Sequence, residues 1–311
     1  MTALGGPDAP HRGGFAGLPD PRARRRREER ASALRSTLVA LLSTVVVFGA
    51  IAFVAVSSPG WPAVQASFFD GSIFASSLPD IASAFLVNIQ LFLISEVLIL
   101  VLALLLAVAR SSTAPVLFPV RLMATIYVDV FRALPGVLVI YILGFGIPGL
   151  NLPGIPTDPF PYAVFALTLI YSAYVSEVYR AGIASVHPSQ AAAARSRGLS
   201  QMQALRHVVL PQAIRRVVPP LLNDFIGLQK DTVLVSYIGV VEIFRQSQII
   251  EAANFNFTPY LAVALVFLVV TIPLARLTDW LIAREARRGL GGSGRAAQAA
   301  NALSRGGTAA P

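Results

Sequence analysis

Six long apolar stretches constrain this chain more than any other feature of its sequence. An apolar helix of about 20 residues crosses the hydrocarbon core of a bilayer. Inside lipid the backbone must satisfy its own hydrogen bonds, which favours helices. We therefore predict an all-α membrane protein with about six transmembrane helices. The predicted spans cover residues 36–57, 81–109, 134–150, 161–178, 217–240 and 260–282.

The overall composition supports a membrane environment. Hydrophobic residues make up 55% of the 311 residues and charged residues only 13%, against about 25% charged in a typical soluble domain. The net charge of +9 could suggest nucleic acid. However, the arginines gather in the tails and a few connections, while long stretches carry no charge, which is typical of membrane proteins. We expect membrane lipid, and not nucleic acid, as a partner.

The basic residues fall on alternate connections between the predicted spans. The N-terminal tail, the connections at 110–132 and 180–216, and the C-terminal region hold almost all of the 25 lysines and arginines. Because basic residues collect on the cytoplasmic side, we predict a multi-pass protein of the bacterial cytoplasmic membrane with both termini in the cytoplasm. Residues 1–35 and 289–311, rich in Gly with Arg or Ala, are expected to be disordered cytoplasmic tails.

The connection between the fourth and fifth spans has a helical pattern of its own. Ser189 is expected to cap an Ala-rich helix that stops at Gly198. Ser200 and Gln203 form a capping-box pattern for a second helix, which Pro211 is expected to end. Two short helices on the membrane surface could rest on lipid headgroups or dock a soluble partner, and the residue pattern leaves both alternatives open.

This connection resembles the cytoplasmic signature of ABC importer permeases. That signature runs Glu-Ala-Ala, three residues, Gly, nine residues, then Ile-x-Leu-Pro. The present chain keeps its spacing, with Ala192 in place of Glu and Val208 in place of Ile. The resemblance implies that residues of about 187–216 couple the chain to an ATPase. The residues that would form this coupling segment are Gln190, Ala192, Ala193, Ala194, Gly198, Leu199, Leu210 and Pro211.

Flanking stretches resemble the permeases of polar amino acids (His, Glu, Gln, Arg or opine type). They are YVDVFRALP at 127–135, AYVSEVYR at 173–180, PQA at 211–213 and KDTVL at 230–234. The resemblance covers residues of about 83–288. It implies a type I ABC importer (MetI-like) core of five helices within residues 81–288. The span at 36–57 would be an extra N-terminal helix.

The resemblance also implies a division of labour between subunits. An extracytoplasmic solute-binding protein would deliver a polar amino acid, and two permease subunits, identical or related, would form the pathway. Separate ABC ATPases would drive transport. The chain offers no P-loop ending, because its one lysine, Lys230, follows Gln229 inside a span. We therefore expect no enzymatic activity of its own. A gradient-driven secondary transporter is the alternative.

The sequence indicates neither a cofactor nor a metal site. It contains no cysteine and only three histidines, all outside the long apolar runs, and no His-Glu-x-x-His motif. Charged residues inside spans are costly and usually face a partner or a pathway. The candidate pathway residues are Glu96, Asn223, Asp224, Lys230, Asp231 and Thr232.

Structural roles compete with the pathway role. Lys230 could form an ion pair with Glu96, and Glu177 could pair with Arg180 three residues further along one helix. The Pro219-Pro220 pair is expected to break the fifth span near its cytoplasmic end.

Overall fold

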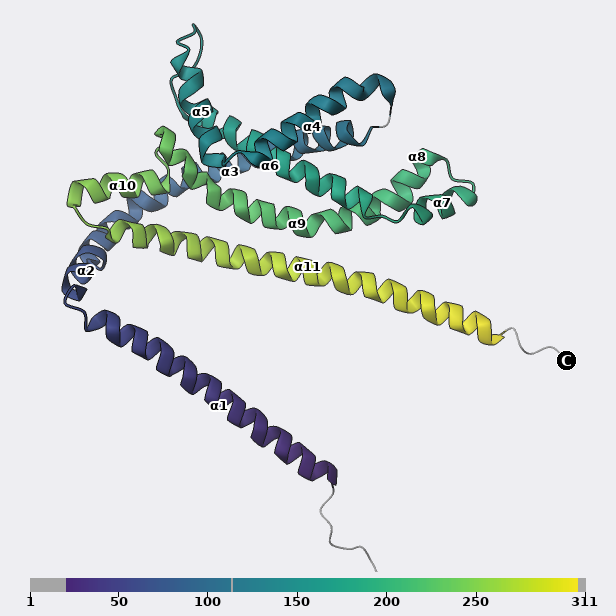
Figure 1. Cartoon of the computed structure of the whole chain (residues 1–311), viewed down its shortest axis with the longest axis horizontal. Coiled ribbons are helices and arrows are strands. Elements are labelled where there is room, and N and C mark those ends of the chain that lie inside the picture. Colours follow the sequence, from purple (N-terminus) through teal and green to yellow (C-terminus); the bar gives the residue numbers. More distant parts are fainter. Residues whose placement is uncertain (1–20, 113, 307–311) are drawn as a thin grey trace, which may run out of the picture. The chain divides into compact units, whose positions relative to one another are not determined.

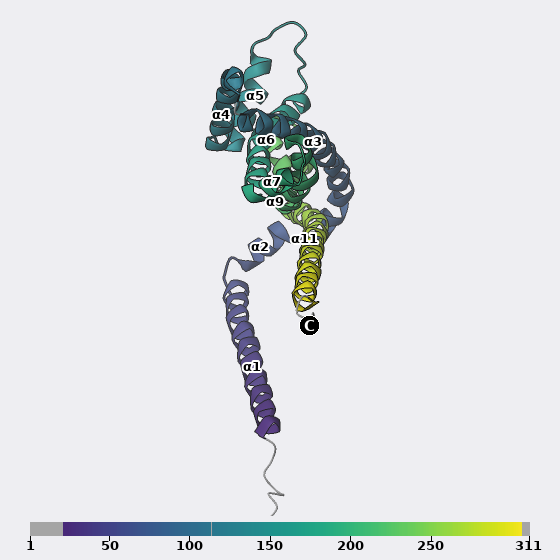
Figure 2. The ribbon, with the colours of Figure 1, turned by 90° about the vertical axis from the view of Figure 1, so that its right-hand side faces the viewer.

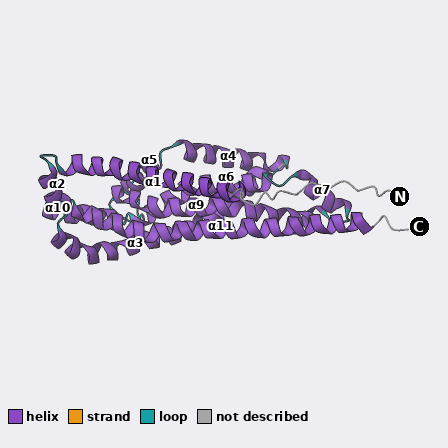
Figure 3. Cartoon of the chain, turned by 90° about the horizontal axis from the view of Figure 1, so that it is seen from below, coloured by secondary structure: helices purple, strands orange, loops and turns teal. Residues whose placement is uncertain are grey.

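The computed structural model describes residues 21–112 and 114–306 of the chain, and this part consists of helices joined by loops, without a strand (Figure 3). Helices η1 and η3 are 3-10 helices and η2 is a π-helical turn. In chain order the elements are α1 (Pro21–Val56), α2 (Trp61–Phe68), α3 (Gly71–Ser111), η1 (Pro115–Leu117), α4 (Phe118–Ala133), α5 (Gly136–Gly149), α6 (Phe160–Ala184), α7 (Pro188–Ser196), α8 (Gln201–Ala204), η2 (Leu205–Val209), α9 (Leu210–Asp231), η3 (Thr232–Ile238), α10 (Ile243–Asn254) and α11 (Thr258–Gly306).

The chain divides into two units, residues 1–65 and 66–311. Helix α1 belongs to the first unit, and every side chain described on it is exposed, including a long row of Leu and Val. A helix surface that is apolar all round is suited to lipid. Its hydrophobic part, Arg35–Val56, is long and apolar enough to cross a membrane.

Both terminal helices extend into regions that we predicted to be disordered. Helix α1 already begins at Pro21, and α11 continues to Gly306. Arg and Ala are good helix formers, and a helix that is already nucleated extends at little cost. The remaining parts of the two predicted tails, residues 1–20 and 307–311, lie outside the described residues.

The second unit supplies the other membrane spans. Three further helical segments, which lie wholly or mostly in this unit, are long and apolar enough for a membrane span: Trp61–Ser111, Phe160–Ala184 and Thr258–Arg284. Two bent pairs pass only when each is taken as one span: η1 and α4 with α5, bent by 106°, and the helices from Gln201 to Ile238 with α10, bent by 49°. The described residues therefore hold four candidate spans, or six with the bent pairs, in agreement with the predicted number.

The third predicted span, residues 134–150, is only half of such a pair. Helix α5 has 14 residues, so it is about 21 Å long, which is too short for a hydrocarbon core of about 30 Å. The preceding segment, predicted to be a connection, forms helix α4. The prediction was wrong here because Arg121 and Arg132 were taken to mark a loop, although a helix accommodates both.

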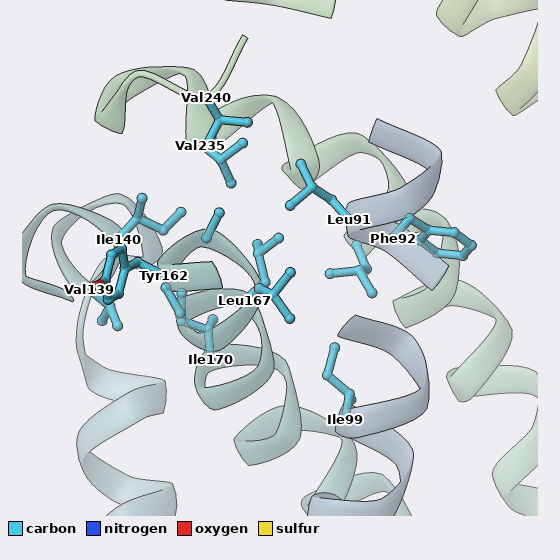
Figure 4. Close-up of a cluster of buried hydrophobic side chains, with 14 of the residues drawn as sticks. Leu91, Phe92, Ile99, Val139, Ile140, Tyr162, Leu167, Ile170, Val235 and Val240 are labelled. Atoms are coloured by element: carbon cyan, nitrogen blue, oxygen red, sulfur yellow. The ribbon is translucent and has the colours of Figure 1, made fainter. Parts of the chain in front are cut away.

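Helix α6 lies at the centre of the second unit and contacts α3, α4, α5 and α9 (Figures 1 and 2). Large apolar side chains from these elements and from η3 form the main core. Figure 4 shows Leu91 and Ile99 of α3, Ile140 of α5, Leu167 of α6 and Val235 of η3 in this cluster. The core fixes α6 against α3 and α9, the helices that carry most of the predicted pathway residues.

Three prolines at which we predicted a helix end or break do not interrupt the helix. Residues 201–231 are helical without a break, so the second short helix continues through η2 into α9 past Pro211. Pro211 lies in the first turn of α9, where its fixed φ suits a helix. Pro219 and Pro220 lie inside α9 without ending it. Neighbouring helices stabilise such prolines in membrane spans, and α6 packs along α9 here.

Candidate functional site

Helix α7 begins and ends at well-defined caps. Its N-cap is His187, whose Nδ1 accepts a hydrogen bond from the Ser189 backbone N–H at 3.2 Å. The prediction of Ser189 as the cap was therefore wrong by two residues, because Pro188 already adopts helical geometry in the first turn. At the other end Gly198 has φ +90°, which glycine adopts without steric cost, so the predicted stop at Gly198 is confirmed.

Two backbone bonds close the end of α7. The N–H of Gly198 donates to the carbonyl of Arg195 at 3.0 Å, and that of Leu199 donates to the carbonyl of Ala194 at 3.3 Å. This is a Schellman motif, which satisfies carbonyls that the helix end would leave free. The chain therefore reverses at Gly198 with a defined geometry.

The capping box at the start of α8 is confirmed. The N–H of Gln203 donates to Ser200 Oγ at 3.3 Å, and the N–H of Ser200 donates to Gln203 Oε1 at 2.9 Å. Because each residue satisfies the other's backbone donor, this turn needs no partner from the rest of the molecule. Helices α7 and α8 lie together at one end of the second unit, and α10 lies at the opposite end (Figures 1 and 3).

Helices α7 and α8 enclose an open cleft of about 680 Å³. Of the residues predicted to couple to an ATPase, Ala192, Gly198 and Leu199 line it. Gln190 and Ala193 are exposed on α7, and Ala194 is buried. Leu210 and Pro211 are exposed at the start of α9, which follows η2.

The predicted coupling segment carries positive charge only. Residues 187–216 contain five arginines and no acidic residue. The segment is thus an exposed, basic element with an apolar tip, because Met202 is 70% exposed.

The helices on either side of this segment are joined tightly. A Cβ on Gly182 of α6 would lie 2.0 Å from Val217 Cγ2 of α9, so the two helices meet where only glycine fits. Arg216 of α9 donates to the backbone carbonyl of Ser185, the C-cap of α6. A force on α7 or α8 would therefore reach α6 and α9 together.

Three of the predicted pathway residues are partly buried. They are Glu96 of α3 and the residues Asp224 and Asp231 of α9. Asp231 accepts a hydrogen bond from the Tyr171 hydroxyl at 2.7 Å. Sequence reasoning missed Tyr171, because nothing in its local sequence marks a partner on α9.

The remaining pathway residues are placed differently. Asn223 and Lys230 are both exposed on α9, and their spacing of seven residues places them near one face of that helix. Lys230 forms no ion pair among the described residues, so the alternative of a pair with Glu96 was wrong. Glu96 is partly buried on α3, whereas the side chain of Lys230 is exposed on α9.

Thr232 belongs to a buried network that the sequence did not reveal. Asn88 Nδ2 donates to Thr232 Oγ1 at 3.0 Å and to Glu242 Oε2 at 2.9 Å. Asn88 Oδ1 accepts from the N–H of Ile243 at 3.0 Å. Glu242 is fully buried and caps α10 by accepting from the N–H groups of Phe244 and Arg245. An acidic residue directly before a helix was the one available signal.

Glu177, near the end of α6, forms the predicted ion pair with Arg180. The distance between Arg180 Nη2 and Glu177 Oε2 is 2.8 Å. It also pairs with Arg110 of α3, which we did not predict. Among the described residues there is no group of three or more His, Cys, Asp or Glu that could hold a metal ion.

Comparisons with known proteins agree with this arrangement. The L-cystine transport system permease protein TcyB of Bacillus subtilis is 35% identical over 230 residues, which cover 73% of this chain and 92% of TcyB. The probable amino-acid permease protein YxeN of the same organism is 32% identical over 211 residues, covering 68% of this chain and 93% of YxeN.

A solved structure is also similar. The crystal structure of an amino acid ABC transporter with histidines contains a chain that is 31% identical, with a TM-score of 0.64, over 69% of this chain and 98% of that one. The inward-facing MetNI methionine ABC transporter, at 16% identity and a TM-score of 0.51, shares the fold. The described helices therefore form a type I ABC importer permease fold.

The family model described as a binding-protein-dependent transport system inner membrane component matches residues 99–287. This match covers more than half of the chain and spans α6, the predicted coupling segment and α9. The chain thus belongs to the family of binding-protein-dependent transport system inner membrane components.

Proposed function

We propose that the chain is the permease subunit of an ATP-driven importer and forms the transmembrane pathway for a polar amino acid. The observation that carries the proposal is the exposed α7–α8 turn. The signature glycine, Gly198, stands at φ +90° and orders a reversal that is exposed at the end of the two tightly packed helices α6 and α9. Several similar permeases are named for the transport of amino acids.

The turn is suited to receive a separate ATPase. Its caps are complete without other parts of the chain, so its exposed residues remain available to a partner. An extracytoplasmic binding protein would deliver the amino acid, and a second permease subunit would complete the pathway. Both termini would lie in the cytoplasm, on the side of α7 and α8, and residues 187–216 would form the coupling segment. The relatives favour this function over gradient-driven transport.

The pathway would contain Glu96 of α3 with Asp224 and Asp231 of α9, all of which are partly buried. Helices α3 and α9 both pack against α6. Charged groups at membrane depth face partners or water-filled paths, and an amino acid offers an ammonium group to such carboxylates. Asn223 and Lys230, on the exposed side of α9, would face the second permease subunit. Thr232 would stabilise the pathway through the hydrogen bond that its hydroxyl accepts from Asn88.

A single cysteine tests the docking. The chain has no cysteine, so Arg197→Cys provides a unique crosslinking site beside the turn. With the cognate ATPase co-expressed, we expect a crosslinker on residue 197 to capture the ATPase. Leu152→Cys is the matched control, because Leu152 is exposed in the loop between α5 and α6, on the predicted opposite side of the membrane. Equal capture from both positions, or none from residue 197 despite full labelling, would contradict the proposal.

A further inference from the structure

Three arginines line one hollow between the end of α3, the start of α4 and the end of α6. The hollow has a volume of about 320 Å³. It lies at the same end of α6 from which the chain enters α7. None of its residues belongs to the coupling segment or to the candidate pathway. The lining residues are Arg110, Phe118, Arg121, Leu122, Thr125 and Arg180.

The positive charge of this hollow is not balanced within the described part of the chain. Glu177 is the one carboxylate paired with these arginines, and it is shared between Arg110 and Arg180. Arg121 forms no ion pair there. Instead it donates to the carbonyl of Ser112 at 2.8 Å and lies 5.4 Å above the Phe118 ring. Three guanidinium groups therefore face one carboxylate, an excess of two positive charges.

Partial burial makes this excess significant. The Arg110 side chain is only 12% exposed, and like charges repel more strongly away from bulk water. Each guanidinium has five N–H donors in a fixed fork that matches phosphate oxygens. The hydrogen bonds within the described residues use one N–H of Arg110, one of Arg121 and two of Arg180. Donors remain for an anion in the hollow.

The outer wall of the hollow is apolar and exposed. Phe118, Leu122 and Ile126 follow one another at four-residue intervals on α4, so they lie on one face of that helix. They are 52%, 47% and 53% exposed. Together α4 and α5 form one of the bent candidate spans. A basic hollow thus borders directly on a helix face suited to an acyl chain.

The geometry points to a binding site for the phosphate of an anionic phospholipid, with an acyl chain along the Phe118–Ile126 face of α4. A free phosphate would satisfy the arginines equally well but would leave this apolar face uncovered. Basic hollows between transmembrane helices commonly hold anionic headgroups. A bound lipid would join the ends of α3, α4 and α6 beside the coupling segment. The inference requires only that the chain is embedded in a membrane, and not that it transports an amino acid.

Native mass spectrometry of the purified full chain tests this site. The probes are phosphatidylglycerol and phosphatidylcholine, each added to the detergent-solubilised protein. We expect the wild type to retain phosphatidylglycerol preferentially. Arg121→Gln should weaken this binding about tenfold, because one charge-assisted interaction with phosphate is lost. Arg195→Gln, which removes an exposed arginine of α7 outside the hollow, should leave the binding unchanged.

A second measurement covers the case in which Arg121→Gln does not fold. A photoreactive phosphatidylglycerol added to the wild type should label peptides between residues 110 and 126. Equal retention of the two lipids, equal losses in the two variants, or labelling confined to other helices would overturn the inference. Complete displacement of phosphatidylglycerol by millimolar inorganic phosphate would also overturn it, since the hollow would then be a phosphate site without a lipid contribution.

Discussion

Two polar regions of this chain are built in opposite ways. The α7–α8 turn is exposed, and its caps join residues no more than five positions apart. The network around Asn88 is buried, and its side-chain bonds to Thr232, Glu242 and Ile243 join residues 144 to 155 positions apart. The first is stabilised by neighbours in sequence and the second by the packing of α3 against η3 and α10.

This difference suggests that the α7–α8 turn and the network around Asn88 have different roles in the molecule. A turn with complete caps can be displaced as a body without exposing unpaired groups, which suits an element that transmits motion. A buried network cannot be displaced in this way, because each unpaired donor or acceptor would cost free energy. We therefore expect substitutions in the network to lower the stability of the whole second unit. Substitutions in the turn should act locally.

The largest effect is expected from Glu242→Ala. Three donors, on Asn88, Phe244 and Arg245, would lose their acceptor. We expect a loss of about 3–5 kcal/mol in the free energy of unfolding, measured by thermal or denaturant unfolding in detergent. Glu242→Gln keeps one accepting oxygen and should lose less. Glu251→Ala, on the helix that Glu242 caps, is the control, because the side chain of Glu251 makes no hydrogen bond among the described residues. Equal losses of unfolding free energy in Glu242→Ala and Glu251→Ala would show that the network around Asn88 does not stabilise the second unit.

A smaller effect is expected at the contact between α6 and α9. Gly182→Ala places a methyl group against Val217, and overpacking of this kind costs about 1–3 kcal/mol. Gly146→Ala on α5 is the control, because a Cβ there meets no atom within 4 Å. Thermal or denaturant unfolding measures the stability of both variants.

The double variant Gly182→Ala with Val217→Ala sharpens this test. Removing the opposing methyl groups should make the combined loss smaller than the sum of the two single losses. Simple additivity would show that the two residues do not compete for the same space.

Gly198→Ala should act within the turn alone. A residue with a Cβ in the left-handed region costs about 1 kcal/mol, and the Schellman bonds would loosen. We expect faster amide hydrogen exchange in residues 188–204 and weaker capture of the ATPase from residue 197. The melting temperature of the second unit should stay unchanged. A marked drop in that temperature would contradict the expectation that the turn acts locally, unlike the buried network around Asn88.

The smallest effect is expected from Ser200→Ala, which removes one half of the capping box. Loss of an N-cap side chain costs about 1 kcal/mol, here confined to the start of α8. Hydrogen exchange of Gln203 should accelerate. Ser200→Thr retains the hydroxyl and should restore most of the protection. Identical exchange in the Ala and Thr variants would show that the hydroxyl does not stabilise the turn.

Much of the fold could be predicted because it depends on short-range rules. The number of spans follows from apolar length, and Gly198 with the Ser200–Gln203 box follows from turn and cap chemistry. The errors lie where tertiary contacts prevail over local tendency. Pro219 and Pro220 stay inside α9 because α6 packs along it, and α4 forms a helix where we predicted a loop.

The sequence by itself determined that this chain spans a membrane, where it turns at Gly198, and which family signature it carries. Only the tertiary structure decided which distant polar groups meet: Asn88 with Glu242, Tyr171 with Asp231, and Glu177 with Arg110. The physical reason is that caps and apolar length depend on nearby residues. The partner of a buried polar group depends instead on which helix faces pack together, and that is fixed only when the whole core forms.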